Sequence, residues 1–351
     1  MISFYPGPSK IYPEVADYLQ DAVKNDVLSI NHRSPEFAEI SKNAILYLKE
    51  KLNIPEDYTV LYTSSATECW EIIAQSLIKR GSYHIYNGAF GEKWYNYTSK
   101  LIPIAQAHKF DKEETINVDN IKVSKDTEVI CLTQNETSNG TQVLEATIKE
   151  LKEKFPEQLI AIDATSSMGG IEIDFTVADI WLASVQKCFG MPAGLGILIC
   201  SPKAINRVLM FNDNHYYNSL VFMYENMQAW QTPYTPNVLN IYLLNRIFNS
   251  VFSIKTISEK IEERAKSWYA FIESLKELTP LITNPTTRSD TVIAVKGEPD
   301  LIRKVKLAAK EKGLLLGSGY GNWKKDTFRI ANFPALNEDE IDVLKNFLKA
   351  F

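Results

Sequence analysis

Paired cysteines, long apolar runs and an excess of positive charge are all missing from this sequence, and each absence excludes a class of protein. The four cysteines include no CxxC pair and three of them sit within apolar runs, so neither a disulfide framework nor a structural zinc site is expected. No stretch approaches the roughly 18 apolar residues of a membrane span, and the N-terminus lacks a basic segment followed by an apolar one. We therefore expect an unexported protein of the reducing cytoplasm, with no metal site.

The overall charge and the spacing of glycines exclude two further classes. A net charge of −5 and a pI near 5.6 argue against a surface dedicated to nucleic acid or to anionic membranes. No GxGxxG motif joins a first strand to a helix, which disfavours a dinucleotide-binding protein. Hydrophobic residues make up 45% of the 351 positions, enough for a sizeable core, and this length suggests two domains.

Strands and helices alternate from about residue 40 to residue 210, which predicts an α/β fold with a mostly parallel sheet flanked by helices. Apolar residues at helical spacing predict one helix over 37–52 and another that opens in 64–68 and runs to about residue 79. The predicted strands are short and mostly apolar, as strands buried on both faces should be. They are 59–63, 84–86, 129–132, 159–163, 180–185 and 196–200.

The pattern changes after about residue 236, where a helix-rich stretch is followed by a shorter set of strands and helices. We expect strands at 291–295, 314–316 and 327–330 and helices at 300–312 and from 338 onwards. This part reads as a smaller α+β domain. The predicted division is a large domain of residues 15–236 and a small domain made of residues 1–14 and 237–351.

Two polar residues at predicted strand ends are the first candidates for chemistry, because ligands of parallel sheets bind beyond the carboxyl ends of the strands. Asp163 ends one buried strand, and Lys187 follows another 24 residues later, after Gln186. Alone, such an aspartate is often only a cap and such a lysine a solvated loop charge. Here the lysine precedes an apolar, glycine-rich segment, 188–196, so we expect it to be partly buried and able to form a Schiff base.

Three more segments follow predicted strands and add polar or aromatic groups to the same edge. The turn at 64–67 joins a strand to a helix and could hold a phosphate with free backbone N–H groups, although it could equally be a simple helix cap. Phe90, within 87–91, could stack on a flat ring, although a bare aromatic is more often part of a core. The segment 135–140 reads as a polar turn. Together these supply a phosphate site, a ring stacker, a carboxylate and a lysine in one order along one sheet.

With these residues in place, the chain resembles the class V aminotransferases of fold type I, and among them the phosphoserine aminotransferases. The resemblance covers nearly the whole chain. It is carried by the Asp163-to-Lys187 spacing with the Gln-Lys pair and by four short segments: 31–37, 135–140, 163–167 and 192–195. It implies pyridoxal 5′-phosphate as cofactor and transfer of an amino group between a small amino acid and a 2-oxo acid.

The resemblance also implies roles for individual residues at the cofactor. Lys187 takes the place of the lysine that forms the Schiff base and moves the substrate proton, and Asp163 that of the carboxylate that keeps the pyridine nitrogen protonated. Phe90 matches the ring stacker, which is tryptophan in many phosphoserine enzymes, and Thr137 the residue near the phenolic oxygen. The phosphate contacts match Gln186 and the cradle residues Ala66, Thr67 and Glu68.

Substrate and subunit contacts follow by the same resemblance. Arg329 matches the arginine that binds the substrate α-carboxylate, a task suited to its planar fork. His32 and Arg33 match further substrate-binding positions. Gln231 and Thr232 match a segment that reaches the cofactor phosphate of the other subunit, which implies a homodimer with shared active sites.

The sequence departs from the best-known phosphoserine enzymes just before Arg329. Those enzymes carry a His-Arg pair there, whereas 316–323 contains neither residue type, and both this stretch and the segment 6–9 look more like alanine–glyoxylate or serine–pyruvate aminotransferases. Phosphoserine and 2-oxoglutarate remain the first expectation, in serine biosynthesis, with those small-amino-acid enzymes as the alternative. A desulfurase or other lyase is less expected because no cysteine follows Cys200. A non-enzymatic binding protein would be favoured had Lys187 or Asp163 been lost.

Overall fold

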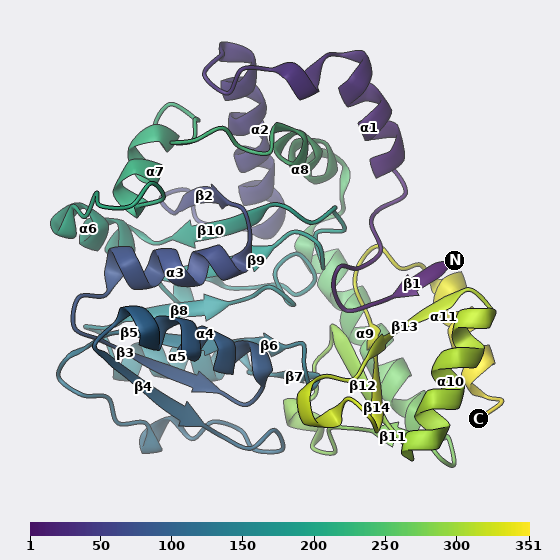
Figure 1. The fold of residues 1–351 in the computed structure, drawn as a ribbon. Helices are drawn as coiled ribbons and strands as arrows, with labels where there is room; N and C mark the ends of the chain where they lie inside the picture. Colours follow the sequence, from purple (N-terminus) through teal and green to yellow (C-terminus); the bar gives the residue numbers. More distant parts are fainter.

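A computed structural model describes residues 1–351 and shows two sheets, each with its own helices and apolar core (Figure 1). We call the seven-stranded sheet with its helices the large unit and the five-stranded sheet with its helices the small unit. The strands of the large sheet are β2 (Thr59–Thr63), β3 (Gly81–Tyr86), β4 (Ile104–Lys109), β5 (Thr127–Thr133), β8 (Leu159–Asp163), β9 (Ile180–Ser184) and β10 (Gly196–Cys200). The strands of the small sheet are β1 (Ile2–Phe4), β11 (Thr279–Pro280), β12 (Val292–Lys296), β13 (Leu314–Ser318) and β14 (Thr327–Ala331).

The large sheet has the strand order β2-β10-β9-β8-β5-β3-β4 and is parallel except at β10. β10 runs antiparallel to both of its neighbours, β2 and β9. The expected mostly parallel sheet flanked by helices is therefore confirmed. The reversal at β10 was not predicted. Its physical reason is the loop between β9 and β10, which is too short for a crossover helix and so makes the two strands antiparallel neighbours.

Helices surround the large sheet in Figure 1. Local sequence explains their limits: in one of them Ser34 caps the first turn, Pro35 occupies its first position, and Asn53 ends it with a positive φ of 59°. The α-helices of the chain up to residue 250 are α1 (Val15–Lys24), α2 (Pro35–Leu52), α3 (Ala66–Leu77), α4 (Ala89–Leu101), α5 (Glu145–Lys154), α6 (Pro202–Phe211), α7 (Leu220–Met227) and α8 (Val238–Ser250). Short 3₁₀ turns lie at Val27–Ser29, Val118–Asn120, Phe175–Val177, Pro285–Thr287 and Gly321–Trp323.

The small unit combines both ends of the chain. Its sheet has the order β1-β13-β14-β12-β11, so the first residues of the chain form an edge strand beside β13. Its helices are α9 (Ile254–Glu273), α10 (Pro299–Glu311) and α11 (Glu338–Leu348). None of the helices of the chain is both long and apolar enough to cross a membrane.

The packing of helix α8 indicates where the boundary between the two units lies. Although α8 follows residue 236, its buried side chains, Ile241 and Leu244 among them, belong to the larger core and the helix packs against α2. Apart from Phe4 and Cys188, the residues of the smaller core all follow from Ala265 onward, within and beyond α9. We therefore propose that the large unit extends through α8 and that the boundary lies in α9, later than the sequence pattern indicates.

The large sheet directs its polar strand ends at the small unit. In Figure 1 the arrowheads of β8 and its parallel neighbours point toward the five-stranded sheet. Asp163 is the last residue of β8, and Lys187 lies in the turn that leaves β9. Arg329 comes from the middle of β14 in the small unit. The candidate residues therefore meet where the two units face each other.

Candidate active site

A polar cavity of about 220 Å³ lies at this junction. Its walls come from the strand ends of the large unit, from the N-terminal segment 6–8, and from β14 and the loop before it. The lining residues are Pro6, Gly7, Pro8, Ala66, Thr67, Trp70, Phe90, Thr133, Asn135, Thr137, Asp163, Thr165, Ser166, Ser184, Gln186, Lys187, Tyr320 and Arg329.

Lys187 is a buried amine held by two hydroxyl groups. Its Nζ lies 2.7 Å from Thr137 Oγ1 and 2.8 Å from Ser166 Oγ, and only 7% of the residue is exposed. Burial lowers the pKa of Lys187 to about 8, against the opposing influence of Asp163 and Glu136. A substantial fraction of the amine is therefore neutral near physiological pH, which is the form that attacks a carbonyl group.

Asp163 is a second buried ionisable group in the cavity. One of its oxygens accepts a hydrogen bond from Trp70 Nε1 at 3.0 Å and the other from the Thr165 N–H at 2.9 Å. Burial raises the pKa of Asp163, whereas these donors and the nearby Lys187 oppose that rise. The carboxylate is thus oriented by fixed donors on one side and available to a cationic or N–H group on the other.

The first turn of α3 presents backbone donors to the cavity. Ser65 accepts from the Glu68 N–H at 3.1 Å, and Ser184 Oγ accepts from the Ala66 N–H at 2.6 Å. The N–H of Thr67 has no acceptor within the chain. A helix N-terminus with a free N–H group is a favourable place for an anion such as a phosphate. The side chain of Glu68 turns away, accepting from Ser64 instead.

Glu136 lies in the turn after β5 and connects this turn to the start of α4. The buried Glu136 carboxylate accepts hydrogen bonds from the N–H groups of Phe90 (3.1 Å), Gly91 (3.2 Å) and Ser138 (2.9 Å). The first two donors belong to α4, whose own N-cap, Gly88, has no side chain to satisfy them. A Cβ at Gly88 would lie 2.2 Å from Glu136 Cγ, so this close contact requires glycine. Glu136 therefore fixes the end of α4 from which the Phe90 ring reaches the cavity.

Arg329 closes the cavity from the small unit. Its Nε donates to the Ser318 carbonyl and its Nη1 to the Thr137 carbonyl, each at 2.8 Å. Burial lowers the pKa of Arg329 to about 10, with Glu136 and Tyr320 opposing the change, so the guanidinium remains charged at neutral pH. Its Nη2 has no partner in the structure and is available for an external acceptor.

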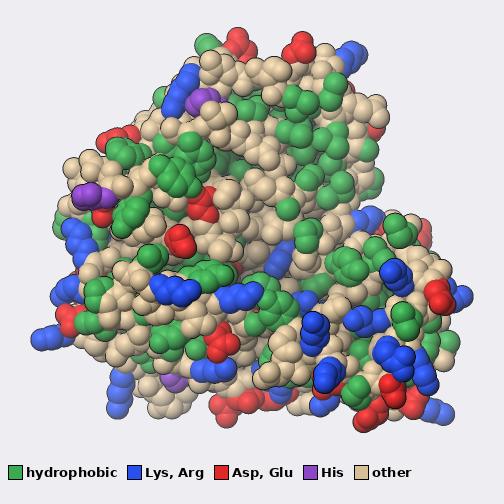
Figure 2. All heavy atoms as spheres, in the orientation of Figure 1, with side chains coloured by type: hydrophobic (Ala, Val, Ile, Leu, Met, Phe, Trp, Pro, Cys, Tyr) green, Lys and Arg blue, Asp and Glu red, His purple; other side chains and the backbone are tan.

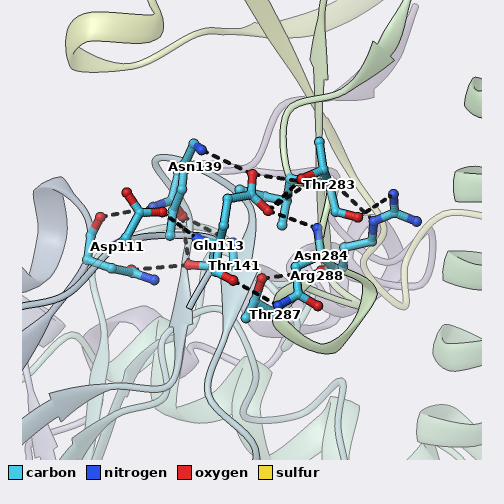
Figure 3. A network of polar contacts seen from close by, with 11 residues as sticks. Asp111, Glu113, Asn139, Thr141, Thr283, Asn284, Thr287 and Arg288 are labelled. Atoms are coloured by element: carbon cyan, nitrogen blue, oxygen red, sulfur yellow. Dashed lines mark hydrogen bonds and ion pairs between the residues drawn. The ribbon is translucent and has the colours of Figure 1, made fainter. Parts of the chain in front are cut away.

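A hydrogen-bond network behind this turn joins the two units (Figure 3). The Glu113 carboxylate, from the loop after β4, accepts from the N–H groups of Thr283 and Asn284 and from the Thr283 hydroxyl. Partial burial alone would raise the pKa of Glu113, but these hydrogen bonds lower it to about 2. Thr141, in the same network, pairs with Arg288 as an isolated β-bridge. The turn that carries Glu136 and Thr137 is thus held directly against the small unit.

Most of the site residues predicted from the sequence come together here, but Glu68 does not line the cavity and four others lie elsewhere. The cavity is lined by Ala66, Thr67, Phe90, Thr137, Asp163, Gln186, Lys187 and Arg329. In contrast, His32, Arg33, Gln231 and Thr232 lie outside it. Arg33 Nη1 donates to Gln231 Oε1 and to Asn226 Oδ1, each at 2.9 Å, so two of these four side chains form a separate cluster with Asn226 on the same chain.

The structure also brings in residues that the sequence reasoning did not single out. Trp70 lies one turn into the helix that follows the cradle, and Ser166 belongs to the segment 163–167 that carries the family resemblance. Gly7 approaches the Lys187 side chain so closely that an added Cβ would lie 3.0 Å from Lys187 Cε. Glu136 lies in the segment 135–140. Position beside recognised motif residues could have indicated Ser166 and Glu136, whereas Gly7 is far from Lys187 in sequence.

The residues of the cavity fit pyridoxal phosphate. Three lining residues carry buried polar atoms with no partner in the protein, namely Thr133 Oγ1, Asn135 Oδ1 and Thr165 Oγ1. Buried polar atoms are rarely left unpaired, so a polar ligand is expected to complete them. A lysine amine, a carboxylate, an aromatic ring and a helix N-terminus around one cavity correspond to the carbonyl, ring nitrogen, ring face and phosphate of that cofactor.

Comparisons with known proteins agree with this geometry. The family model described as Aminotransferase class-V matches residues 3–321. The phosphoserine aminotransferase of Rhodococcus opacus (strain B4) is 27% identical over 353 residues, which cover 96% of this chain and 91% of the relative. The solved structure of a phosphoserine aminotransferase from Cytophaga hutchinsonii has a TM-score of 0.94 and 35% identity, over 99% of this chain and 98% of that one. An aspartate aminotransferase of subgroup IV from Thermus thermophilus shares the fold, with a TM-score of 0.88 at 21% identity over 100% and 98% of the two chains. The chain belongs to the class-V aminotransferase family, and it is a pyridoxal-phosphate-dependent transaminase of fold type I.

Proposed function

We propose that this enzyme moves the amino group between phosphoserine and 2-oxoglutarate, as a step in the formation of serine in the cytoplasm. The observation that carries the amino-transfer chemistry is the meeting of Lys187, Asp163 and Arg329 in one cavity. The similarity to enzymes named phosphoserine aminotransferase, at 35% identity for a solved structure and 27% for a curated relative, supports the choice of substrate.

The cofactor, when bound, supplies an electron sink that stabilises negative charge on the substrate α-carbon. Lys187 is the residue that binds it covalently and then carries a proton to and from the α-carbon, a role suited to an amine whose pKa lies near 8. Asp163 would hold a proton at the pyridine nitrogen, because its buried carboxylate is fixed by Trp70. Phe90 would stack on the ring face, and Thr137, which positions the Lys187 amine, would lie near the phenolic oxygen.

In this proposal, residues of the large unit would hold the cofactor phosphate and a residue of the small unit would hold the substrate. The free N–H of Thr67, with Ala66, Glu68 and Gln186 around it, holds the cofactor phosphate at the N-terminus of α3. Arg329 binds the substrate α-carboxylate through its free Nη2, while its other two donors anchor it to backbone carbonyls. An anchored guanidinium excludes alternative substrate orientations, which is how positioning contributes to rate.

A homodimer with shared active sites accounts for the residues outside the cavity. Arg33 and Gln231 hydrogen-bond to each other on the surface of one chain, and Thr232 follows directly. We propose that this cluster, with His32, reaches the cavity of the second subunit. Apolar side chains gather on the face over α1, α2 and α8 in Figure 2, and Val23, Leu28 and Phe252 are among the exposed ones, as expected for a surface covered by a partner.

One feature keeps a second candidate open, namely a small-amino-acid aminotransferase that uses glyoxylate or pyruvate. The loop 318–323 places no arginine or histidine beside Arg329, and Tyr320 from this loop lines the cavity. A pocket of this kind suits alanine or serine unless another cation receives the substrate phosphate.

A steady-state assay of the holoenzyme separates the two candidates. Amino donors phosphoserine, serine and alanine are each paired with 2-oxoglutarate, glyoxylate and pyruvate, and the amino product is quantified. The proposal expects the highest kcat/KM for phosphoserine with 2-oxoglutarate. A higher kcat/KM for alanine or serine with glyoxylate or pyruvate would replace it with the second candidate.

The shared site is tested by mixing subunits. Neither Lys187→Ala nor Gln231→Ala alone should support turnover, whereas a mixed dimer regains one intact site when the two defects reside on different chains. Recovery of up to about a quarter of wild-type activity is expected for random mixing of equal amounts, since half of the dimers are mixed and each has one intact site. No recovery, in a mixture shown to exchange subunits, would place Gln231 in its own chain's site.

A further inference from the structure

A lysine lies beside two residues that line the cavity, Phe90 and Tyr320, and Tyr320 belongs to the loop that lacks a His-Arg pair. Lys93, in the second turn of α4, points its Nζ at the Tyr320 hydroxyl, with which it forms a hydrogen bond. The same Nζ lies 5.4 Å from the centre of the Phe90 ring. The Phe90 and Tyr320 rings contact each other, with 5.4 Å between their centroids. Both Lys93 and Tyr320 are half-buried, so the ammonium faces the rim and not the bulk solvent alone.

Two cations lie against the one Tyr320 ring. Lys93 Nζ is 5.2 Å from its centroid and Arg329 Cζ is 5.5 Å from it. The two positive groups are therefore separated by no more than the sum of these distances. That spacing suits a small molecule with an anion at each end, one end on each cation, since each hydrogen-bonded contact itself spans roughly 3 Å.

The surroundings leave the Lys93 charge uncompensated. None of the ion pairs in the structure includes Lys93, and its neighbour Glu92 pairs with Lys109. On the adjoining face of the small unit, Lys and Arg side chains gather around α10 (Figure 2), and a groove there is lined by Arg303, Lys306, Lys310, Lys324 and Lys325. Ser318 lines this groove and links it to the cavity residue Arg329, because its carbonyl accepts from Arg329 while its hydroxyl accepts from Lys306. In a chain of net charge −5, positive potential is thus concentrated beside this rim.

We propose that Lys93, with the Tyr320 hydroxyl, forms the subsite for the distal anion of the substrate. The inference rests on the proposed function and deepens it, because both phosphoserine and 2-oxoglutarate carry an anionic group beyond the α-carboxylate. One cation that serves a phosphate in one half-reaction and a carboxylate in the other satisfies both substrates. It also supplies the charge that the loop 316–323 lacks. Lys93 is here a specificity-determining residue, and proton transfer does not involve it.

The competing explanation is that Lys93 only braces the Tyr320 and Phe90 rings. Bracing acts on every substrate alike, since the Phe90 ring lies beside the cofactor whichever amino acid is bound. An anion subsite acts only on substrates with a distal charge. The ratio of kcat/KM values for charged and uncharged substrates therefore separates the two explanations.

The experiment compares the Lys93→Met and Lys93→Arg holoenzymes with wild type, using phosphoserine, glutamate and alanine as amino donors. Lys100→Met is the matched control, because Lys100 lies on the same helix and its Nζ contacts only the outer Tyr97 ring. We expect Lys93→Met to raise KM for phosphoserine and glutamate about 10- to 100-fold, the range for loss of a hydrogen bond to a charged group, and to change KM for alanine less than about 3-fold. Lys93→Arg should recover most of the discrimination. Equal losses for all three donors, or no loss for phosphoserine, would overturn the subsite.

A binding measurement keeps this result separate from the proposed function. Inorganic phosphate is titrated as a competitive inhibitor of the holoenzyme, with thermal melting and the visible absorbance of the bound cofactor as checks on folding. The subsite predicts a weaker inhibition constant for phosphate in Lys93→Met and in Tyr320→Phe, with Lys100→Met unchanged; equal constants in all forms would contradict it. If wild type uses glutamate but not phosphoserine, the choice of substrate fails while the Lys93 effect on glutamate still decides the subsite.

Discussion

Two parts of the cavity differ in how firmly their side chains are held. The floor is formed at the strand ends of the large sheet, and the rim is formed by α4 and the loop before β14. On the floor, Lys187 and Asp163 are buried, as is Glu136 in the turn that carries Thr137, and each makes at least two hydrogen bonds to other parts of the chain. On the rim, Lys93 and Tyr320 are half-buried and hold mainly each other. Burial is what shifts the pKa values of the floor residues, so the chemistry belongs to the floor. Selection of the substrate belongs to the rim, where side chains can be exchanged without loss of the reaction.

The difference also appears in where the residues come from. The floor is assembled from strand ends of the large sheet, whose order and register place Asp163 beside Thr133. The rim is assembled from α4, the loop before β14 and, in the proposed dimer, Arg33 of the second subunit. The network around Glu113 joins the two units (Figure 3), and the Thr141–Arg288 bridge within it ties the segment after Thr137 to the small unit.

Loss of the floor lysine should have the largest effect. We expect Lys187→Ala to reduce kcat at least about 1,000-fold, because both the covalent attachment and the proton transfer are lost. The visible absorbance of the purified protein should change as well. Lys149→Ala, an exposed lysine on α5, is the control. Retained activity and an unchanged spectrum in Lys187→Ala would remove the lysine from its role.

Loss of the carboxylate arginine should come next and should not discriminate between substrates. Arg329→Lys keeps a charge but not the planar fork, so KM for phosphoserine, glutamate and alanine should all rise about 10- to 100-fold. Steady-state kinetics on the three donors measures this. An effect confined to phosphoserine would assign Arg329 to the distal anion and so reverse the division between floor and rim.

A smaller effect is expected from the buried carboxylate that holds α4. Glu136→Gln replaces one accepting oxygen by an amide N–H₂, so either Ser138 or the pair Phe90 and Gly91 loses its acceptor, which costs about 1–3 kcal/mol of unfolding free energy. Because the Glu136 charge raises the pKa of Lys187, its removal should also lower that pKa below about 8.

The check on Glu136 has two readouts. Denaturant unfolding gives the stability change, with the exposed Glu150→Gln as control. The pH dependence of cofactor uptake by the cofactor-free chain gives the lysine pKa, since only the neutral amine reacts. An uptake profile unchanged from wild type would show that Glu136 holds the helix without influencing Lys187.

The smallest effect should come from the link between the units. The pKa of Glu113 is depressed to about 2, so its contribution to stability is complete above its unfolded value near 4.5 and is lost as the pH falls toward 2. Glu113 is largely solvent-screened, so Glu113→Gln should cost less than about 1 kcal/mol at pH 7. Wild type and variant should converge in thermal stability at acid pH; a difference that persists at pH 2 would exclude the carboxylate charge as its origin.

The sequence was most informative where a single pattern determines a single element. The strands 59–63, 159–163 and 196–200 have the predicted limits, and all four cysteines are buried, because apolar runs bounded by turns allow few other arrangements. The edge strand β4 was not predicted: Ile104–Lys109 is polar and largely exposed, and it becomes a strand only by pairing with β3. The strand β1 was missed for the same reason, since its partner β13 lies at the other end of the chain.

The site followed the same rule. Residues within recognised segments, such as Lys187 and Thr137, could be named from the sequence. Contacts made only by the fold could not be: Trp70 reaches Asp163 across 93 positions, and Lys93 reaches Tyr320 across 227. The sequence correctly indicated that the loop 316–323 lacks an arginine and a histidine, but only the packing of that loop on α4 shows which cation lies there.

The central claim is that the floor performs amino transfer on substrates that carry a second anion. It is tested most directly by mixing the holoenzyme with phosphoserine, glutamate, serine or alanine in the absence of any acceptor and recording the visible absorbance of the bound cofactor. We predict rapid changes at low concentrations of phosphoserine and glutamate, reversed by 2-oxoglutarate, and much slower ones with serine and alanine. Faster changes with alanine or serine, together with none on addition of phosphoserine, would contradict the account.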